Sequence, residues 1–332
     1  MTERSIKTVG IIGTGVIGGG WAVHFLARGY DVVAWDPSPD AAAGLATMID
    51  WAWPSMQSLG LAPGAAPDRW RMAGTLEECA AAADFIQESA PERLDLKRDL
   101  LARLAAAAGG GVVVASSTSG YSMTEMATKA EDASQLVVGH PFNPPYLVPL
   151  VEVVGGERTK KSAVDDACRI YDEAGKAVIR MDAEIPGFIA NRLQDAIWRE
   201  ALHMVNAGEA TVEQIDRSIT EGPGLRWALM GPCLTFHLAG GQGGMAHMLD
   251  HFGPSLLEPW TRLVAPELTS DLRDRMVEGC EEEAAGRTIA DLVQERDRGL
   301  VAILKARRGA APRPSAPPTP DSSPPDSSPR NS

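Results

Sequence analysis

The feature that most constrains this chain is a glycine-rich loop close to its N-terminus. Residues 8–12 (TVGII) form a short apolar run, and Gly13-Thr14-Gly15-Val16-Ile17-Gly18 follows it directly. A helical pattern of apolar residues then continues as far as Gly29. A strand, a turn with this glycine spacing and a helix are together typical of a loop that wraps around the pyrophosphate of a dinucleotide.

Each glycine of this loop has a physical role in such a fold. Gly13 permits the tight turn, Gly15 lets backbone N–H groups approach a phosphate, and Gly18 lets the helix pack close to the strand. Asp36 closes a second apolar run, residues 31–36 (DVVAWD). A carboxylate at this place accepts hydrogen bonds from ribose hydroxyls and repels a 2′-phosphate, so we expect NAD rather than NADP. The alternative is that Asp36 only caps the turn that follows it.

Short apolar runs alternate with helical patterns through the first half of the chain. The runs lie at residues 8–12, 31–36, 83–87, 111–115, 136–139 and 149–154. This alternation predicts an α/β fold, a Rossmann-like doubly wound parallel sheet with helices on both faces, which we place at residues 1–185. Residues 186–308 show mostly helical patterns and predict an all-α domain. Residues 309–332, rich in Pro and Ser, lack apolar periodicity, so we expect a disordered tail.

Composition and charge argue against several classes of function. The chain has 332 residues, enough for two domains, and 44 acidic against 31 basic residues give a net charge of −13. This excess of negative charge disfavours nucleic acid and anionic membrane surfaces as partners. No apolar run reaches the ~20 residues of a membrane span. The four cysteines form no CxxC pair, so we expect reduced thiols, no bound metal and a cytoplasmic location.

A second group of polar residues follows the later strands. His140 comes directly after the run at residues 136–139, and residues 116–120 (SSTSG) follow the run at residues 111–115. Glu152 lies within an apolar run, where an unpaired carboxylate is unfavourable. An imidazole beside a carboxylate can accept the proton of an alcohol, so the pattern predicts a catalytic pair of His140 and Glu152. The alternative is that His140 has a purely structural role.

The order of these motifs resembles that of a known family. The glycine loop, STSG at residues 117–120, HPFNP at residues 140–144, the strand of Glu152 and GFIANR at residues 187–192 resemble the 3-hydroxyacyl-CoA dehydrogenase superfamily. The resemblance extends over about residues 6–305, and it implies a Rossmann-like NAD-binding domain followed by a helical domain that forms a homodimer.

The resemblance also implies roles for particular residues. His140 is implied to be the general base and Glu152 the carboxylate that orients it. Ser119 is implied to hydrogen-bond the substrate oxygen, and Asn191 to reach the same centre from the helical domain. Glu88 and Ser117 are implied to belong to the NAD site.

The identity of the substrate rests on a narrower resemblance. Residues 140–159 and the run Gly224-Leu225-Arg226-Trp227 are most similar to family members that oxidise L-carnitine, a small 3-hydroxy acid. Family members that act on L-gulonate are similar through the first of these segments. A short 3-hydroxyacyl-CoA is a further alternative substrate, and an NAD-binding structural protein of the crystallin kind is the alternative without catalysis.

A trimethylammonium headgroup has no N–H group to donate, so proteins usually hold it against aromatic faces. The aromatic side chains that could do so here are Phe142, Tyr146, Trp198, Trp227 and Phe236. For each of them the alternative is packing in a core or in a dimer interface. The acidic balance of the chain fits a cationic substrate better than it fits coenzyme A.

Overall fold

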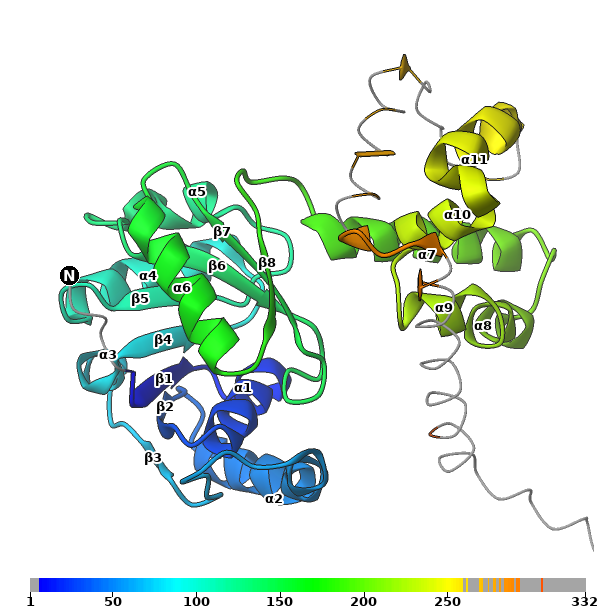
Figure 1. The fold of residues 1–332 in the computed structure, drawn as a ribbon. Coiled ribbons are helices and arrows are strands. Elements are labelled where there is room, and N and C mark those ends of the chain that lie inside the picture. The colour runs from blue at the N-terminus through cyan, green and yellow to red at the C-terminus, as the bar shows by residue number, and fades with distance from the viewer. Residues whose placement is uncertain are drawn as a thin grey trace, which may run out of the picture. The chain divides into compact units, whose positions relative to one another are not determined.

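The computed structural model describes residues 6–258 and, beyond them, residues 261, 269–270, 274, 277–278, 281, 284–289, 291–292 and 306. The chain divides into two compact units, Met1–Asp195 and a second that begins at Ala196 (Figure 1). The division falls within helix α7 (Ile189–Asn206), after the change of sequence pattern at residue 186. The expected tail, residues 309–332, lies outside the described residues.

An eight-stranded sheet forms the centre of the first unit, in the order β3-β2-β1-β4-β5-β6-β7-β8. Its strands are β1 (Thr8–Ile12), β2 (Asp31–Trp35), β3 (Trp70–Met72), β4 (Phe85–Glu88), β5 (Val113–Ser116), β6 (Leu136–Pro141), β7 (Leu150–Gly155) and β8 (Ala177–Arg180). The order reverses between β1 and β4, and sheets of this kind bind ligands at that switch point, beyond the carboxyl ends of the strands. The predicted doubly wound α/β fold is confirmed.

The sheet differs from the expected one in its direction and its edges. Strands β6 and β7 pair antiparallel, whereas the other neighbours pair in parallel. Residues 142–149 join β6 to β7, and this connection is too short for the helical crossover that a parallel pair requires. The sequence patterns also missed the two edge strands: β3 has three residues and β8 has four, too few for a clear periodic signal.

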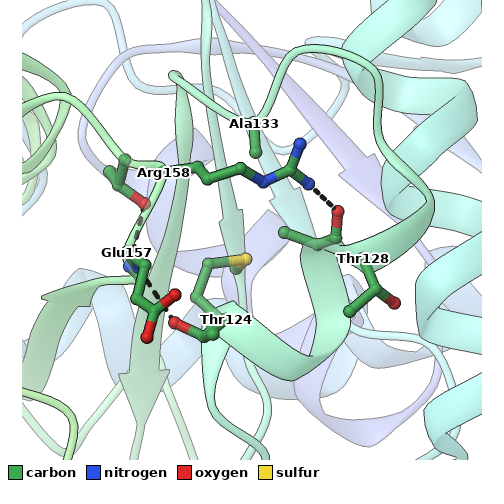
Figure 2. Close-up of a pocket in the computed structure, with 9 residues that line it drawn as sticks. Thr124, Thr128, Ala133, Glu157 and Arg158 are labelled. Carbon is green, nitrogen blue, oxygen red and sulfur yellow. Dashed lines mark hydrogen bonds between the residues drawn. The ribbon is translucent and has the colours of Figure 1, made fainter.

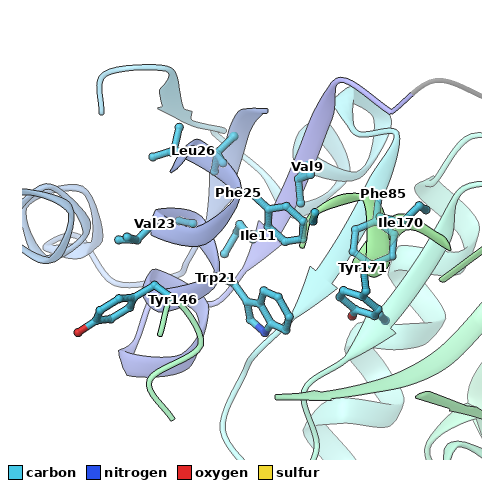
Figure 3. Close-up of a cluster of buried hydrophobic side chains, with 14 of the residues drawn as sticks. Val9, Ile11, Trp21, Val23, Phe25, Leu26, Phe85, Tyr146, Ile170 and Tyr171 are labelled. Carbon is cyan, nitrogen blue, oxygen red and sulfur yellow. The ribbon is translucent and has the colours of Figure 1, made fainter. Parts of the chain in front are cut away.

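Each face of the sheet carries its own hydrophobic core. Alternate residues of a strand point to opposite faces. Val9 and Ile11 of β1 accordingly pack with one group of helices, while Ile12 packs with the other. The first group is α1 (Val16–Ala27), α2 (Ala41–Leu59) and α6 (Lys161–Glu173), and the second is α3 (Leu76–Ala82), α4 (Leu94–Ala107) and α5 (Met123–Met126). Figure 3 shows the first core, where Phe25 and Tyr171 are fully buried. A buried side chain of this size contributes roughly 1.5–3 kcal/mol to stability.

The second unit is helical where the structure describes it. After α7 come α8 (Val212–Thr220), α9 (Pro223–Trp227), α10 (Pro232–Ala239) and α11 (Gly244–Phe252). Thr211 and Gln214 form a capping box that starts α8, and α9 and α10 each begin with a proline, which suits the first helical position. Met230, Leu234 and Met245 belong to its small core.

Candidate active site

The glycine-rich loop has the geometry that its sequence predicts. Gly13 has φ +84°, a left-handed conformation that favours glycine, and a Cβ atom there would lie 2.9 Å from the Ser89 carbonyl oxygen. At Gly18 an added Cβ would lie only 1.8 Å from the Gly13 carbonyl oxygen. Both positions therefore require glycine, because the start of α1 packs directly on the loop and on the end of β4.

The N-terminus of α1 is open to a negatively charged group. Its N-cap residue is the exposed Gly15, which offers no side chain to cap the helix, and the first turn contains no acidic residue. Backbone N–H groups of the first turn are unpaired within a helix, and the helix dipole adds partial positive charge there. These residues fit the pyrophosphate of a dinucleotide.

Asp36 lies just beyond β2 and binds the glycine loop. Its Oδ2 accepts hydrogen bonds from the Thr14 backbone N–H at 2.8 Å and from Thr14 Oγ1 at 3.3 Å, while Oδ1 accepts one from the Ser38 N–H at 2.9 Å. The turn-capping role considered for Asp36 is therefore present. A carboxylate has about four acceptor positions. Because Asp36 is only half-buried, the positions that these three contacts do not use can accept from ribose hydroxyls.

His140 and Glu152 face each other across the antiparallel pair of β6 and β7. His140 Nδ1 lies 2.9 Å from Glu152 Oε2, and the two residues are 4% and 0% exposed. Burial opposes ionisation of Glu152, but hydrogen bonds from His140 and from two backbone N–H groups outweigh it and lower the pKa of the carboxyl. An ionised Glu152 only accepts hydrogen bonds, so Nδ1 of His140 is the nitrogen that donates, and Nε2 is the ring nitrogen that can accept a proton.

The start of α7 holds the other oxygen of this carboxylate. Glu152 Oε1 accepts hydrogen bonds from the N–H groups of Ile189 and Ala190, both at 2.9 Å. Gly187 and Phe188 precede the helix with φ +72° and +53°, so the chain makes a sharp left-handed turn there. This turn aims a helix N-terminus at a buried anion, an arrangement that the helix dipole stabilises. Phe188 itself packs on His140, with ring centroids 5.3 Å apart.

Ser119 and Asn191 meet at the same rim. Asn191 Nδ2 donates a hydrogen bond to the Ser119 carbonyl oxygen at 2.9 Å, and Ser119 is exposed. Glu92, which the sequence analysis did not single out, accepts hydrogen bonds from the Ser119 N–H at 3.1 Å and from Thr118 Oγ1 at 2.5 Å. Its side chain is 41% exposed. The available signal was its position four residues after Glu88, beyond the carboxyl end of β4.

Glu88 has a different environment from the one expected for a residue that contacts NAD. It is fully buried, and its carboxylate binds Lys97 Nζ at 2.9 Å, the Ala90 N–H at 2.7 Å and the Ser116 hydroxyl. Lys97 is 1% exposed and also approaches Glu92 at 3.4 Å. The Glu88–Lys97 pair therefore holds the loop after β4 against α4. Ser117 is likewise engaged by protein groups, since its Oγ lies within hydrogen-bond distance of Trp21, Gln87 and Ser89.

Comparison with known proteins matches both parts of the chain. Residues 8–185 match the NAD-binding domain of 3-hydroxyacyl-CoA dehydrogenase, and residues 187–271 match its C-terminal domain. The chain belongs to the 3-hydroxyacyl-CoA dehydrogenase family. The predicted resemblance is thereby confirmed, as are NAD as the cofactor and an oxidoreductase that acts on a CH–OH group.

Three curated relatives of this family member match it over most of their length. The L-carnitine dehydrogenase of Streptomyces griseus is 68% identical over 310 residues, which are 93% of this chain and 92% of that protein. The L-carnitine dehydrogenase of Streptomyces coelicolor is 67% identical over 92% of this chain and 96% of that protein. The enzyme of the same name from Pseudomonas aeruginosa is 54% identical, with coverages of 92% and 97%.

Solved structures of the family have the same fold. The (S)-3-hydroxybutyryl-CoA dehydrogenase of Ralstonia eutropha is 26% identical, with a TM-score of 0.59 over 86% of this chain and 98% of that chain. The 3-hydroxyacyl-CoA dehydrogenase of Archaeoglobus fulgidus has a TM-score of 0.64 over 92% and 99% of the two chains; at 22% identity it supports the fold alone.

The structure separates the five aromatic candidates for a headgroup site. Phe142 is half-buried, and its ring centroid lies 4.9 Å from that of His140. Tyr146 is 7% exposed and belongs to the core of the first unit (Figure 3), so it is a packing residue in this structure. Trp198, Trp227 and Phe236 belong to the second unit, where Trp198 is 62% and Phe236 is 49% exposed.

A separate cavity of about 280 Å³ lies between α5 and the turn that follows β7 (Figure 2). The guanidinium of Arg158 donates to the carbonyl oxygens of Ala127 and Ala130, and the Glu157 N–H donates to Thr124 Oγ1 at 2.9 Å. None of the predicted site residues lines it. Its polar groups are occupied in holding the end of α5, so we assign it a structural role.

In the part of the chain that the structure describes, no three His, Cys, Asp or Glu side chains lie together as a metal site would require. Within the same residues, every helix is too short or too polar to cross a membrane.

Proposed function

We propose that this protein oxidises the 3-hydroxyl of L-carnitine to give 3-dehydrocarnitine and NADH. The identity of 54–68% to three L-carnitine dehydrogenases, over at least 92% of this chain, is the observation that carries the proposal. The buried pair of His140 and Glu152 supports a catalytic rather than a structural role for the chain.

We assign His140 as the general base. Glu152 accepts the hydrogen on Nδ1, so Nε2 is the nitrogen that takes the hydroxyl proton as carbon loses its hydride. Bound NAD supplies the hydride acceptor. The imidazolium that forms lies against the Glu152 carboxylate, which two helix N–H groups already hold in place. The positive charge on His140 therefore develops next to a negative charge that is already positioned. Proton transfer of this kind is typically worth about 10²–10⁴-fold in rate.

Ser119 and Asn191 position the substrate oxygen in this proposal. Glu92 and Asn191 hold the backbone of Ser119 from both sides, through its N–H and its carbonyl oxygen. The Ser119 hydroxyl is thereby left to hydrogen-bond the oxygen that becomes a ketone. Phe142, whose ring lies next to that of His140, is the aromatic face of the first unit that we propose for the trimethylammonium group.

Initial rates of NADH formation test the choice of substrate. The assay compares L-carnitine, D-carnitine, L-gulonate, 3-hydroxybutyrate and 3-hydroxybutyryl-CoA at alkaline pH, which favours a reaction that releases a proton. We expect turnover with L-carnitine and little with its enantiomer. Turnover of L-gulonate or of the acyl-CoA in its place would overturn the substrate, and no turnover with any of the five would favour a non-catalytic NAD-binding protein.

We further propose that residues 1–185 bind NAD, and that residues 186–308 bind substrate and form a cytoplasmic homodimer. Large apolar side chains on α7 support the dimer, since Ile197, Trp198 and Leu202 are 43%, 62% and 50% exposed. Apolar groups gathered on one helix in this way usually mark an interface. Sedimentation equilibrium should give twice the chain mass; a monomer at micromolar concentration would contradict this proposal.

A further inference from the structure

A cluster of buried polar groups lies directly behind the glycine-rich loop. We call it the buried relay; it consists of Trp21, Gln87, Ser89, Ser117 and Tyr171. Figure 3 shows Trp21 of α1 next to Tyr171 of α6, and their rings stack with centroids 5.4 Å apart. Trp21, Gln87 and Tyr171 are fully buried, whereas Ser89 and Ser117 are partly exposed. The proposed mechanism uses none of these hydroxyl, amide or indole groups.

Tyr171 is the residue that sets which groups of the buried relay donate and which accept. Burial raises the pKa of its phenol well above the ordinary value, so the hydroxyl is protonated and donates to Gln87 Oε1. Gln87 Nε2 then donates its two hydrogens, to Ser117 Oγ at 2.8 Å and to the Gly139 carbonyl oxygen at 3.3 Å. The flipped amide would place its oxygen against the Gly139 carbonyl, so only this orientation is satisfied.

The Ser117 hydroxyl can then point in one direction only. Its oxygen accepts from Gln87 Nε2 and from Trp21 Nε1 at 3.2 Å, and neither of these nitrogens can act as an acceptor here. Both lone pairs of Ser117 Oγ are therefore used. Its hydrogen must go to Ser89 Oγ, which lies 2.8 Å away. Within the described part of the chain, Ser117 is the hydrogen-bond partner of the Ser89 hydroxyl, so the hydrogen of Ser89 remains available to a ligand.

Ser89 lies where the sheet order reverses. Ser89 directly follows β4 and lies next to Gly13, which follows β1. A Cβ atom added to Gly18 would lie 3.2 Å from the Cβ of Ser89. Along this edge of the sheet, Asp36 follows β2, the glycine loop follows β1, and His140 lies in β6. If Asp36 held the adenosine beyond β2 and the glycine loop held the pyrophosphate beyond β1, the nicotinamide riboside half of NAD would lie toward the end of β4, on the side of His140.

We propose that the Ser89 hydroxyl donates a hydrogen bond to the nicotinamide riboside half of NAD, and that the buried relay fixes this direction from behind. Ser117 is then a positioning residue that acts through Ser89. The proposal rests on NAD as the cofactor. It adds a specific donor to the NAD site, one that neither the glycine motif nor Asp36 accounts for.

Binding of nucleotides to the Ser89→Ala variant tests the donor. NADH contains the nicotinamide riboside and ADP does not, so their dissociation constants are measured side by side, by NADH fluorescence and by calorimetry. We expect Ser89→Ala to weaken NADH about 3- to 10-fold, the loss of one hydrogen bond, and to leave ADP unchanged. Ser162→Ala, an exposed serine of α6, is the matched control and should change neither constant.

Two results would overturn the donor. An unchanged NADH constant in Ser89→Ala would mean that the hydroxyl has no ligand partner. Equal weakening of NADH and ADP would place the effect at the pyrophosphate or in the loop as a whole. If Ser89→Ala melts below the assay temperature, Ser89→Cys keeps the size of the side chain with a much weaker donor and takes its place. Wild-type binding of NADH and turnover of L-carnitine report separately on the cofactor and on the proposed function.

A double-mutant cycle tests the positioning role of Ser117. Because Ser117 acts through Ser89, we expect the double variant Ser89→Ala/Ser117→Ala to bind NADH no more weakly than the weaker of the two single variants. Fold-changes that multiply would instead mean that Ser117 contacts NAD independently of Ser89, and the relay would then be excluded. Melting temperatures of all variants identify any loss that comes from unfolding.

Discussion

Among the described residues of the first unit, the carboxylates of Glu88 and Glu152 are fully buried, and their surroundings differ in one respect that matters. Glu88, at the end of β4, is neutralised by Lys97 and held by the Ala90 N–H and the Ser116 hydroxyl. Glu152, in the middle of β7, is bound by His140 and by two N–H groups at the start of α7. Both solutions satisfy a buried anion, as burial of a charge requires.

The difference lies in what the neutralising partner can do. The Lys97 ammonium donates all of its hydrogens to protein groups, so the pair with Glu88 is closed. The imidazole of His140 has a second nitrogen, Nε2. When a proton binds there, the resulting imidazolium stays ion-paired with Glu152 through Nδ1. Burial of a carboxylate therefore does not by itself indicate catalysis; a partner that can gain and lose a proton does.

The largest effect that we expect comes from removing the cation that pairs with Glu88, and it is an effect on stability. Lys97→Met leaves Glu88 buried without its cation, and removal of one partner of a buried pair costs roughly 3–5 kcal/mol of unfolding free energy. Urea denaturation followed by circular dichroism measures the change. The matched control is Lys161→Met, which breaks an exposed pair with Asp165 on α6 and should cost less than about 1 kcal/mol. Equal losses in the two variants would contradict a structural role for Lys97.

The second expected effect is on rate. Glu152→Gln keeps the volume of the side chain but removes the anion that orients His140 and stabilises the imidazolium. We expect kcat with L-carnitine to fall on the order of 10²-fold, or about 2.7 kcal/mol, while the NADH dissociation constant is retained. Glu173→Gln, on the surface of α6, serves as the control and should keep full activity. An unchanged kcat in Glu152→Gln would remove the distinction between the two carboxylates.

A third prediction concerns a buried cation without a carboxylate. Lys176 is 5% exposed, donates to the carbonyl oxygens of Pro145 and Val148, and lies 4.7 Å from the centre of the Trp21 ring. Burial and the nearby Arg28 lower its pKa to about 7. The unfolded chain, with a lysine pKa near 10.4, binds more protons between these values. This group therefore makes the protein more stable as the pH rises from about 7 to about 10, by up to about 1.4 kcal/mol per unit.

Substitution of this lysine isolates its contribution. Lys176→Met should lose this rise, so the difference in unfolding free energy between wild type and variant should change from pH 7 to pH 9. Urea denaturation at the two pH values measures it. A difference that stays constant with pH would mean that Lys176 is not forced toward its neutral form.

Much of the fold and of the candidate site could be predicted from the sequence, and the parts that could not be predicted have physical reasons. The glycine loop is a local pattern in which each glycine has one geometric task, and Gly13 and Gly18 have the expected geometry. Asp36 lies just beyond β2 as the pattern indicates, and its contact with ribose stays a prediction. The link between Glu88 and Lys97 depends on a helix that folds back over the strand, and no periodic pattern reports it. Tyr146 illustrates the same limit, because an aromatic residue in a loop has the same sequence signature whether it faces a ligand or the core.

The most direct test of the account is the rate of L-carnitine oxidation by His140→Ala, measured together with its NADH dissociation constant. We predict that kcat falls about 10²–10⁴-fold, because the hydroxyl proton has lost its acceptor, while NADH binding stays within about twofold of wild type. The paired measurement separates chemistry from cofactor binding. A variant that binds NADH normally and still oxidises L-carnitine at the wild-type rate would contradict the assignment of His140 as the base.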